Sequence, residues 1–249
     1  MQQPAPPNSD LARRIELLQE VALFADLPDQ ALEKLAQDFR LKTYGKNDVV
    51  FHQGDPGHEI YVILDGRIRV FKVSPSGDET TLVILSKYDV LGEFAVLDGG
   101  TRSATARAIG QTALLAMSRD SFNSYMRSVP GLATGMTKLL TTKLRWTAAY
   151  AAAVAQYDAA ARLLHIILLY NGKFGEEQEK GVRYELDLSL NQGELASLVG
   201  ARREWVNRLL RDWRKRSLLE YDSGKIIILN LPGVVAERDR RIQGSRSVW

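Results

Sequence analysis

The sequence of 249 residues contains no cysteine. Disulfides, iron–sulfur clusters, thiolate zinc sites and cysteine nucleophiles are therefore excluded, and the expected compartment is the reducing cytoplasm. Long apolar runs are also missing: none approaches the ~18 residues that span a bilayer. The first nine residues lack the basic start and apolar core of a signal peptide. We therefore expect a cytoplasmic protein without a membrane partner.

An excess of charge of one sign is missing too, since 33 basic residues face 30 acidic ones. A polycation that coats nucleic acid or membrane indiscriminately is thus excluded, and any basic patch must be local. The histidines His52, His58 and His165 show no metal-ligand spacing, and no nucleophile has a base at a fixed offset. We expect no enzyme, no metal and no haem.

The chain is long enough for two domains with separate cores. Residues 1–10 are rich in proline and predict a tail without structure. Residues 11–39 have apolar residues at helical spacing and predict two short helices, the second opened by Pro28 and Asp29. Between Tyr44 and Met117, frequent glycines separate short alternating strands, in which Tyr61 and Ile63 mark one face. This segment predicts a compact β-roll.

A long helical segment follows from Pro130 to Tyr170, interrupted near Asp158 and stopped by Asn171 and Gly172. Its heptads predict pairing with a second copy, so we expect a homodimer. The rows of this seam are Leu140, Thr147, Val154 and Met136, Lys143, Tyr150, Tyr157. The charged segment 176–180 reads as a polar loop; contact with RNA polymerase is possible there, but solvated loops of this kind are commoner. A strand from Val182 to Leu188 opens the second core.

A glycine–acid pair followed by an arginine–serine pair predicts a site for a cyclic nucleotide. Gly92 lets backbone approach a phosphate, Arg102 neutralises it with directed donors, and Ser103 adds a hydroxyl. A carboxylate in this setting can accept the 2′-hydroxyl of ribose, which makes Glu93 a sugar anchor. The competing interpretation is an exposed ion pair between Glu93 and Arg102, worth under ~1 kcal/mol.

A helix-turn-helix is predicted from Asn191 onward, where Asn191 and Glu194 form a capping box and Gly200 ends the first helix. The second helix buries one stripe, and the segment 202–216 holds seven basic and two acidic residues, a net +5. A glutamate within a basic face fits a major groove, where arginine reads guanine and glutamate accepts from cytosine. The alternative is a solvated helix with i,i+4 pairs such as Glu204 with Arg208. A hairpin over residues 218–229, turning at Ser223 and Gly224, adds a wing.

These segments together resemble the cyclic nucleotide-binding domains and the bacterial Crp-Fnr family of transcription regulators, over about residues 21–231. The resemblance rests on Leu23, Phe24, Leu27, Pro28, on the turn 53–57, on the run 61–66, and on the two pairs at Gly92 and Arg102. It implies an α+β fold with an N-terminal cyclic nucleotide-binding β-roll, a long central dimerisation helix and a C-terminal winged helix-turn-helix. The implied boundaries are residues 1–20 for the tail and lead-in helix and 21–129 for the cyclic nucleotide-binding domain. The dimerisation helix would cover residues 130–157, and the winged helix-turn-helix residues 158–249.

The resemblance also implies roles for single residues. The ligand set is Gly92, Glu93, Phe94, Arg102, Ser103, Ala104 and Thr147. Within it Glu93 holds the ribose, Arg102 and Ser103 hold the cyclic phosphate, and Thr147 meets the adenine of cyclic AMP, the allosteric ligand. The serine usual beside this threonine is Ala148 here, which leaves one adenine contact from the partner subunit open.

The DNA-contact set implied by the resemblance is Arg203, Glu204, Arg208, Arg202 and Arg211, the first three reading bases of a palindromic site. Ala201 and Arg202 replace small cap residues, and Trp205 stands where a threonine touches phosphate, so agreement with the family's GTGA half-site stays open. Two alternatives to a cyclic AMP-controlled regulator remain. One is the same architecture without a ligand or with another effector. The other is a nucleotide-sensing adaptor whose C-terminal module binds protein.

Overall fold

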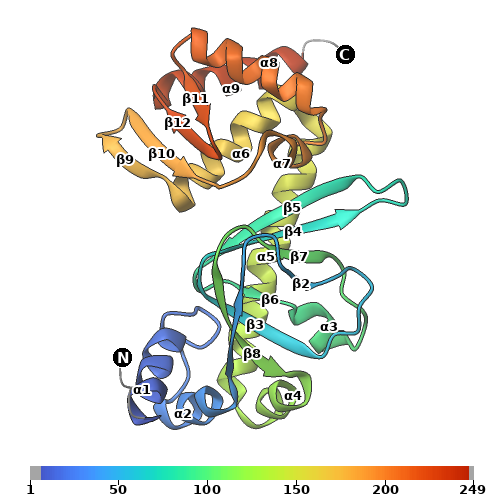
Figure 1. Cartoon of the computed structure of the whole chain (residues 1–249), viewed down its shortest axis with the longest axis vertical. Coiled ribbons are helices and arrows are strands. Elements are labelled where there is room, and N and C mark those ends of the chain that lie inside the picture. The colour runs from blue at the N-terminus through green and yellow to red at the C-terminus, as the bar shows by residue number, and fades with distance from the viewer. Residues whose placement is uncertain (1–6, 247–249) are drawn as a thin grey trace. The chain divides into compact units, whose positions relative to one another are not determined.

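The computed structural model describes residues 7–246, which form two compact units (Figure 1). Of the described residues, the first unit comprises 7–78 and 82–145, and the second comprises 79–81 and 146–246. The boundary between them falls inside one helix, α5 (Pro130–Gln156). The assignment of residues 130–157 to a separate dimerisation helix stays a prediction.

Two helices precede the strands, as the apolar spacing predicts. They are α1 (Pro7–Gln19) and α2 (Asp29–Asp38), and Pro28 is the N-cap residue of the second. The predicted structureless tail over residues 1–10 is wrong at its end, because α1 already begins at Pro7. Proline is well tolerated in the first helical turn, where its missing N–H has no partner in any case. Residues 1–6 lie outside the described residues.

The β-roll consists of two four-stranded antiparallel sheets. The strands are β1 (Arg40–Tyr44), β2 (Val49–Phe51), β3 (Glu59–Asp65), β4 (Arg67–Val73), β5 (Glu79–Ser86), β6 (Val90–Leu91), β7 (Thr105–Ala108) and β8 (Thr112–Ser118). Their order is β1-β8-β3-β6 in one sheet and β2-β7-β4-β5 in the other. Two short helices, α3 (Glu93–Asp98) and α4 (Arg119–Ser128), complete the unit.

Two apolar clusters stabilise this unit, and β3 contributes to both. Tyr61 and Ile63 pack with residues of the roll interior, whereas Ile60 and Val62 pack with the helices α1, α2 and α4 and the start of α5. The strand is therefore buried on both faces, not on one as its alternation predicts. Arg69, which the alternation of β4 places toward solvent, is also buried; its guanidinium lies 4.5 Å from the centroid of the Phe71 ring. The favourable cation–π contact offsets part of the cost of burying that charge.

Helix α5 ends where the sequence predicts an interruption. Asp158 is the N-cap residue of α6 (Ala159–Phe174), and its carboxylate accepts a hydrogen bond of 2.6 Å from the Ala161 N–H. The predicted stop at Asn171 and Gly172 is wrong, since α6 continues for three further residues to Phe174. The ring of Phe174 stacks on Tyr170, and such packing can outweigh the ~1 kcal/mol that an interior glycine costs.

The second unit adds a four-stranded sheet and three helices. They are β9 (Glu176–Glu179), β10 (Arg183–Asp187), α7 (Gln192–Ser197), α8 (Arg203–Lys215), β11 (Leu219–Asp222), β12 (Lys225–Ile228) and α9 (Leu231–Arg246). The sheet order is β11-β12-β10-β9. The predicted loop over residues 176–180 is mostly strand β9 instead, because a tight turn brings it back onto β10, where the Tyr184 hydroxyl donates a 2.6 Å hydrogen bond to Glu177.

No helix over residues 7–246 is both long and apolar enough to cross a membrane. In the same part of the chain, no group of three or more histidine or acidic side chains is arranged to hold a metal ion.

The capping box of α7 gives a stability prediction. Asn191 Oδ1 accepts hydrogen bonds from the N–H groups of Gly193 and Glu194, and the Glu194 carboxylate accepts one from the Asn191 N–H. Asn191→Ala should lower the free energy of opening of α7 by about 1 kcal/mol, because two amides lose their partner. Native-state hydrogen exchange of the α7 amides measures this. Asn191→Asp, which keeps the acceptor, should exchange like the wild type; equally fast exchange in both variants would contradict the cap's role.

Candidate functional site

The predicted nucleotide site is built around the turn between β6 and α3. Gly92 has φ of +82°, a region that residues with a side chain rarely adopt. A Cβ atom there would lie 2.5 Å from Arg102 Nη1 and 3.1 Å from the Glu59 carbonyl oxygen. Gly92 therefore permits both the sharp turn and the close approach of the arginine, whereas its predicted role beside a phosphate stays a prediction.

Arg102 is the central cation of this cluster and is only 4% exposed. Nη1 donates a 2.7 Å hydrogen bond to the Gly92 carbonyl, and Nη2 donates one of 2.7 Å to the Glu59 carbonyl. Its guanidinium lies 4.3 Å from the centroid of the Phe51 ring. Burial lowers the pKa of Arg102 from its usual value, although Tyr61 and nearby carboxylates oppose this shift. An arginine nevertheless stays charged in proteins.

The charge of Arg102 has no direct acidic partner. None of the described carboxylates forms an ion pair with it, and its Nε is buried without a hydrogen-bond partner in this part of the chain. The exposed ion pair between Glu93 and Arg102, which was the alternative to a nucleotide site, is therefore absent from the described contacts. A buried cation held only by neutral carbonyls is suited to receive an anion.

Glu93 is also buried, at 2% exposure, but its charge is paired. Lys143 of α5 donates a 2.7 Å hydrogen bond to Glu93 Oε1 and one of 2.8 Å to the Val90 carbonyl. The same ammonium lies 5.8 Å from the centroid of the Phe94 ring. Lys143, which does not suit an apolar dimer seam, thus faces α3 of its own chain.

A second acidic residue lies close to Arg102. Lys42 donates hydrogen bonds of 2.6 and 2.8 Å to the Glu59 carboxylate, and the Tyr61 hydroxyl donates one of 2.7 Å. Burial alone would raise the pKa of Glu59, but these bonds outweigh it and the pKa is lowered. Burial, followed by the bond to Glu59, raises the pKa of Tyr61. Sequence reasoning missed Lys42, Phe51 and Glu59, since each is an ordinary strand residue there.

The remaining predicted ligand residues divide into two groups. Phe94 and Ser103 are exposed and Ala104 is buried, all three near the cluster in the first unit. Thr147 is exposed on α5 but belongs to the second unit. The structure therefore brings Gly92, Glu93, Phe94 and Arg102 together, and the meeting of Thr147 with this cluster stays a prediction.

The helix-turn-helix of the second unit has the predicted form. Between α7 and α8 the chain turns at Gly200, whose φ is +62°. Helix α8 buries Val206, Leu210 and Trp213. The predicted contact residues all lie exposed at its start or along its outer side: Arg202, Arg203, Glu204, Arg208 and Arg211. An open groove of about 580 Å³ lies at the start of this helix, and its lining includes Arg202, Glu204, Arg208 and Trp205.

The cations of α8 are mostly not neutralised by neighbours. Among the described residues, Arg202, Arg203 and Arg208 form no ion pair, so the i,i+4 pair of Glu204 with Arg208 expected for a solvated helix is not formed. Arg211 donates only to the carbonyl of Asn207, at 3.3 Å. The outer face of α8 thus presents positive charge available to phosphates and base edges.

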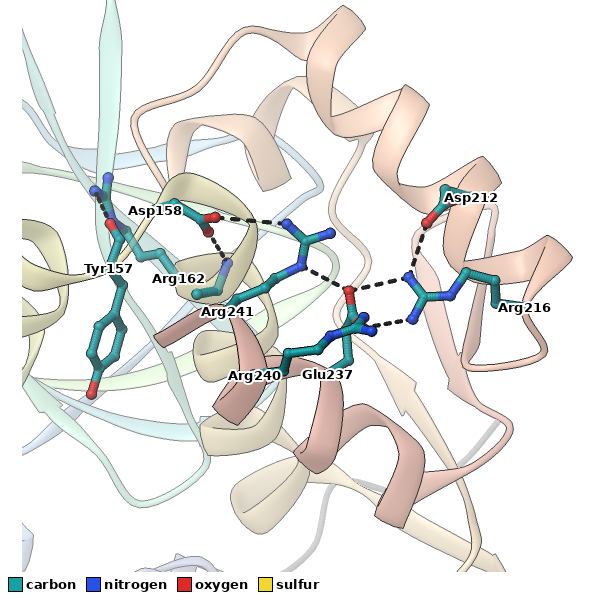
Figure 2. Close-up of polar contacts among 9 residues, drawn as sticks. Tyr157, Asp158, Arg162, Asp212, Arg216, Glu237, Arg240 and Arg241 are labelled. Atoms are coloured by element: carbon teal, nitrogen blue, oxygen red, sulfur yellow. Dashed lines mark hydrogen bonds and ion pairs between the residues drawn. The ribbon is translucent and has the colours of Figure 1, made fainter. Parts of the chain in front are cut away.

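The turn before α8 is hydrogen-bonded to both neighbouring helices of the unit. The Tyr150 hydroxyl of α5 donates to the Leu198 carbonyl at 3.0 Å, and Arg162 Nη1 of α6 donates to the Val199 carbonyl at 2.6 Å. Arg162 Nη2 also donates to the Tyr157 carbonyl just after α5 (Figure 2). The same atom donates to the Val154 carbonyl near the end of α5. The start of the exposed helix is therefore held by residues that also contact the central helix.

The wing has the turn that its sequence predicts. Ser223 and Gly224 both have positive φ, 49° and 98°, as a two-residue hairpin with the right-handed strand twist requires. The strands β11 and β12 pair in register from Leu219 with Ile228 to Asp222 with Lys225.

Comparisons with known proteins identify the two domains that carry these residues. Residues 41–129 match the cyclic nucleotide-binding domain, and residues 160–236 match the Crp-like helix-turn-helix domain. The chain is 28% identical over 225 residues to a "CRP-like cAMP-activated global transcriptional regulator" of Mycobacterium tuberculosis, covering 90% of this chain and 99% of the relative. It is 29% identical over 214 residues to the "Cyclic AMP receptor protein" of Thermus thermophilus, covering 82% and 90%.

Among solved structures, the c-di-GMP responsive global regulator CLP of Xanthomonas campestris superposes with a TM-score of 0.71. The match covers 82% of this chain and all of that chain at 20% identity, which supports the fold alone. The fold class predicted from the sequence is confirmed, and the adaptor that binds protein in place of DNA is set aside. The chain is a DNA-binding transcription regulator with a cyclic nucleotide-binding domain and belongs to the Crp-Fnr family.

Proposed function

We propose that this regulator is controlled by cyclic AMP, which binds at Arg102. The observation that carries the proposal is the buried guanidinium without an acidic partner, because the cyclic phosphate would supply the missing anion. The names of the relatives in Mycobacterium tuberculosis and Thermus thermophilus favour cyclic AMP as the nucleotide. Glu93 would accept the ribose 2′-hydroxyl, and Thr147 would meet the base.

A second candidate is a regulator of the same build that answers another effector or none. The pairing of Glu93 with Lys143 favours it, since this carboxylate already has a partner. Ala148 favours it as well, because it removes a hydroxyl beside Thr147. The structural neighbour responsive to c-di-GMP indicates that one fold can serve different ligands.

Two copies of the chain would form the active regulator through α5. In the second row of the predicted seam, Met136 is buried and Lys143 and Tyr150 hydrogen-bond within their own chain, so this row, which ends at Tyr157, has less side-chain surface to offer a partner. The exposed stripe combines Leu144 and Val154 with small residues between them: Thr147, Ala148, Ala151 and Ala155. Small side chains let two helices approach closely, and Leu144, 69% exposed, would bury most apolar area.

The DNA site would be palindromic, because a dimer presents two copies of α8 to half-sites about one turn apart. Such a regulator acts where the chromosome lies, in the cytoplasm. Contact with RNA polymerase would use another surface, for which the exposed strand β9 is one candidate.

Arg102→Ala should weaken cyclic AMP binding about tenfold to a hundredfold, because a charge-assisted hydrogen bond worth ~1.5–3 kcal/mol is lost. Isothermal titration calorimetry with cyclic AMP and cyclic GMP measures this. Arg40→Ala removes an exposed cation from the same unit and should leave the affinity unchanged. Equal affinity of the wild type and Arg102→Ala would refute the site, and no heat with either nucleotide would favour the second candidate.

Arg203→Ala should cost ~1–3 kcal/mol of affinity for the cognate site, because a bidentate contact to a base is lost, and spare binding to unrelated DNA. A duplex selected by the wild-type protein from random sequences serves as the cognate site in a fluorescence-anisotropy titration. Arg214→Ala is the control variant, because it removes one positive charge from the same helix at a residue that pairs with Glu220 at 3.3 Å. Equal losses on both duplexes would argue against base readout.

Leu144→Glu should shift the protein from dimer to monomer, because two carboxylates would face each other in an apolar seam. Sedimentation velocity measures the shift. Thr142→Glu adds the same charge at an exposed position on the opposite side of α5 and should remain dimeric. A dimeric Leu144→Glu protein would exclude this stripe as the interface.

A further inference from the structure

The C-terminal helix α9 carries a buried acid that the matched domains do not include. The helix-turn-helix match ends at residue 236, and Glu237 follows directly with only 3% of its surface exposed. Three arginines surround its carboxylate: Arg216, Arg240 and Arg241 (Figure 2). So dense a charge cluster at the end of a small domain calls for a role.

The first of these contacts joins α9 to the end of α8. Arg216 is the C-cap residue of α8. Its Nη1 donates a 3.1 Å hydrogen bond to Glu237 Oε1, and its Nη2 donates one of 2.6 Å to Oε2. Nη1 also donates to Asp212 of α8 at 3.2 Å. This two-point geometry fixes direction as well as distance, which a single contact would not.

The other arginines extend the network within α9 and to α6. Arg241 Nε donates a 2.8 Å hydrogen bond to Glu237 Oε1, and its Nη1 lies 3.6 Å from Asp158 Oδ2. Asp158 is the N-cap residue of α6, and Arg240 also pairs with Glu237. The carboxylate of Glu237 therefore connects one end of α8 with one end of α6, as Figure 2 shows.

Burial makes this network sensitive to geometry. An ionised carboxylate removed from water is strongly destabilised unless it keeps a cationic partner and hydrogen bonds to its oxygens. Any rotation of α8 that pulled Arg216 away would break both of its hydrogen bonds to the buried carboxylate, and only the arginines of α9 itself would remain as partners. The network therefore favours a single orientation of α8 over nearby alternatives.

A small change of orientation matters for a helix of this length. Helix α8 has 13 residues. At about 1.5 Å per residue it is roughly 20 Å long, so a tilt of about 10° around one end moves the other by about 3 Å. Hydrogen bonds to base edges tolerate only tenths of an ångström. The start of α8 is held through the turn by Arg162, and Glu237 holds its end.

We propose that Glu237 is a positioning residue for DNA recognition, which fixes the angle of α8 by holding Arg216. The inference rests on the proposed base readout by Arg203, Glu204 and Arg208. It predicts that loss of the Glu237 charge lowers sequence discrimination more than it lowers affinity for DNA in general.

The test is Glu237→Gln in the full chain, measured by fluorescence anisotropy on the selected cognate duplex and on a scrambled duplex of equal length. The ratio of the two affinities should fall at least tenfold. Affinity for the scrambled duplex should stay equal or rise slightly, since the variant loses one negative charge. Glu220→Gln makes the same charge change by removing the half-buried partner of Arg214, and its ratio of cognate to scrambled affinity should stay at the wild-type value.

A second variant guards against loss of the fold. Arg216→Lys keeps the positive charge but loses the two-point contact of the guanidinium with the Glu237 carboxylate. The Arg216 side chain is 38% exposed, so the unit should tolerate this change. Its ratio of cognate to scrambled affinity should also fall, by a smaller factor than in Glu237→Gln, and its circular dichroism spectrum should match that of the wild type. If Glu237→Gln folds and keeps the wild-type ratio of cognate to scrambled affinity, the positioning role is overturned and the base readout is not. If Glu237→Gln unfolds, a wild-type ratio in Arg216→Lys overturns the positioning role instead. A wild-type protein without sequence preference would overturn the base readout and the positioning role together.

Discussion

The burial of Arg102 is the constraint on which the nucleotide-binding unit depends. A guanidinium with little access to water must be held by polar groups, and here the carbonyls of Gly92 and Glu59 do so at 2.7 Å each. Only a glycine at position 92 permits that approach, and the loop of Arg102 is in turn fixed by backbone bonds with Gly54 and Asp55. Neutral acceptors leave the positive charge without a counterion. The site is thus pre-organised for an anion, which reduces the entropic cost of binding.

In the second unit, hydrogen bonds and ion pairs of arginines position the recognition helix α8. It must hold a cationic helix at a fixed angle while leaving its outer face free of partners. The carbonyls of Leu198 and Val199 accept from Tyr150 and Arg162 at the start of that helix, and Glu237 acts at its end. Arg214 and Arg216, which are neutralised, lie at the end of the helix, whereas the arginines that pair with no acid within residues 7–246 lie at its start and on its exposed side.

Local signals in the sequence predicted much of this structure. The capping box at Asn191, the N-cap at Asp158 and the turn at Ser223 and Gly224 each depend on neighbouring residues, and all three are confirmed. Errors arose where tertiary contacts decide. Gly172 lies within α6 although glycine favours a stop, and the alternation of β4 gave no sign that Arg69 is buried beside Phe71. Such contacts come from residues distant in sequence.

The pairing of Lys143 with Glu93 also affects which ligands the pocket can accept. Two negative groups about 6 Å apart repel by roughly 3 kcal/mol at an effective dielectric constant of about 20, enough to weaken binding more than a hundredfold. An unscreened Glu93 would repel any phosphate drawn in by Arg102. With an ammonium 2.7 Å from its carboxylate, the acid is locally neutral. In the proposed complex, Lys143 would thus reduce the repulsion between Glu93 and the phosphate at Arg102, and the Glu93 carboxylate could still accept a sugar hydroxyl through its second oxygen. An uncharged nucleoside would gain no charge–charge attraction from the guanidinium.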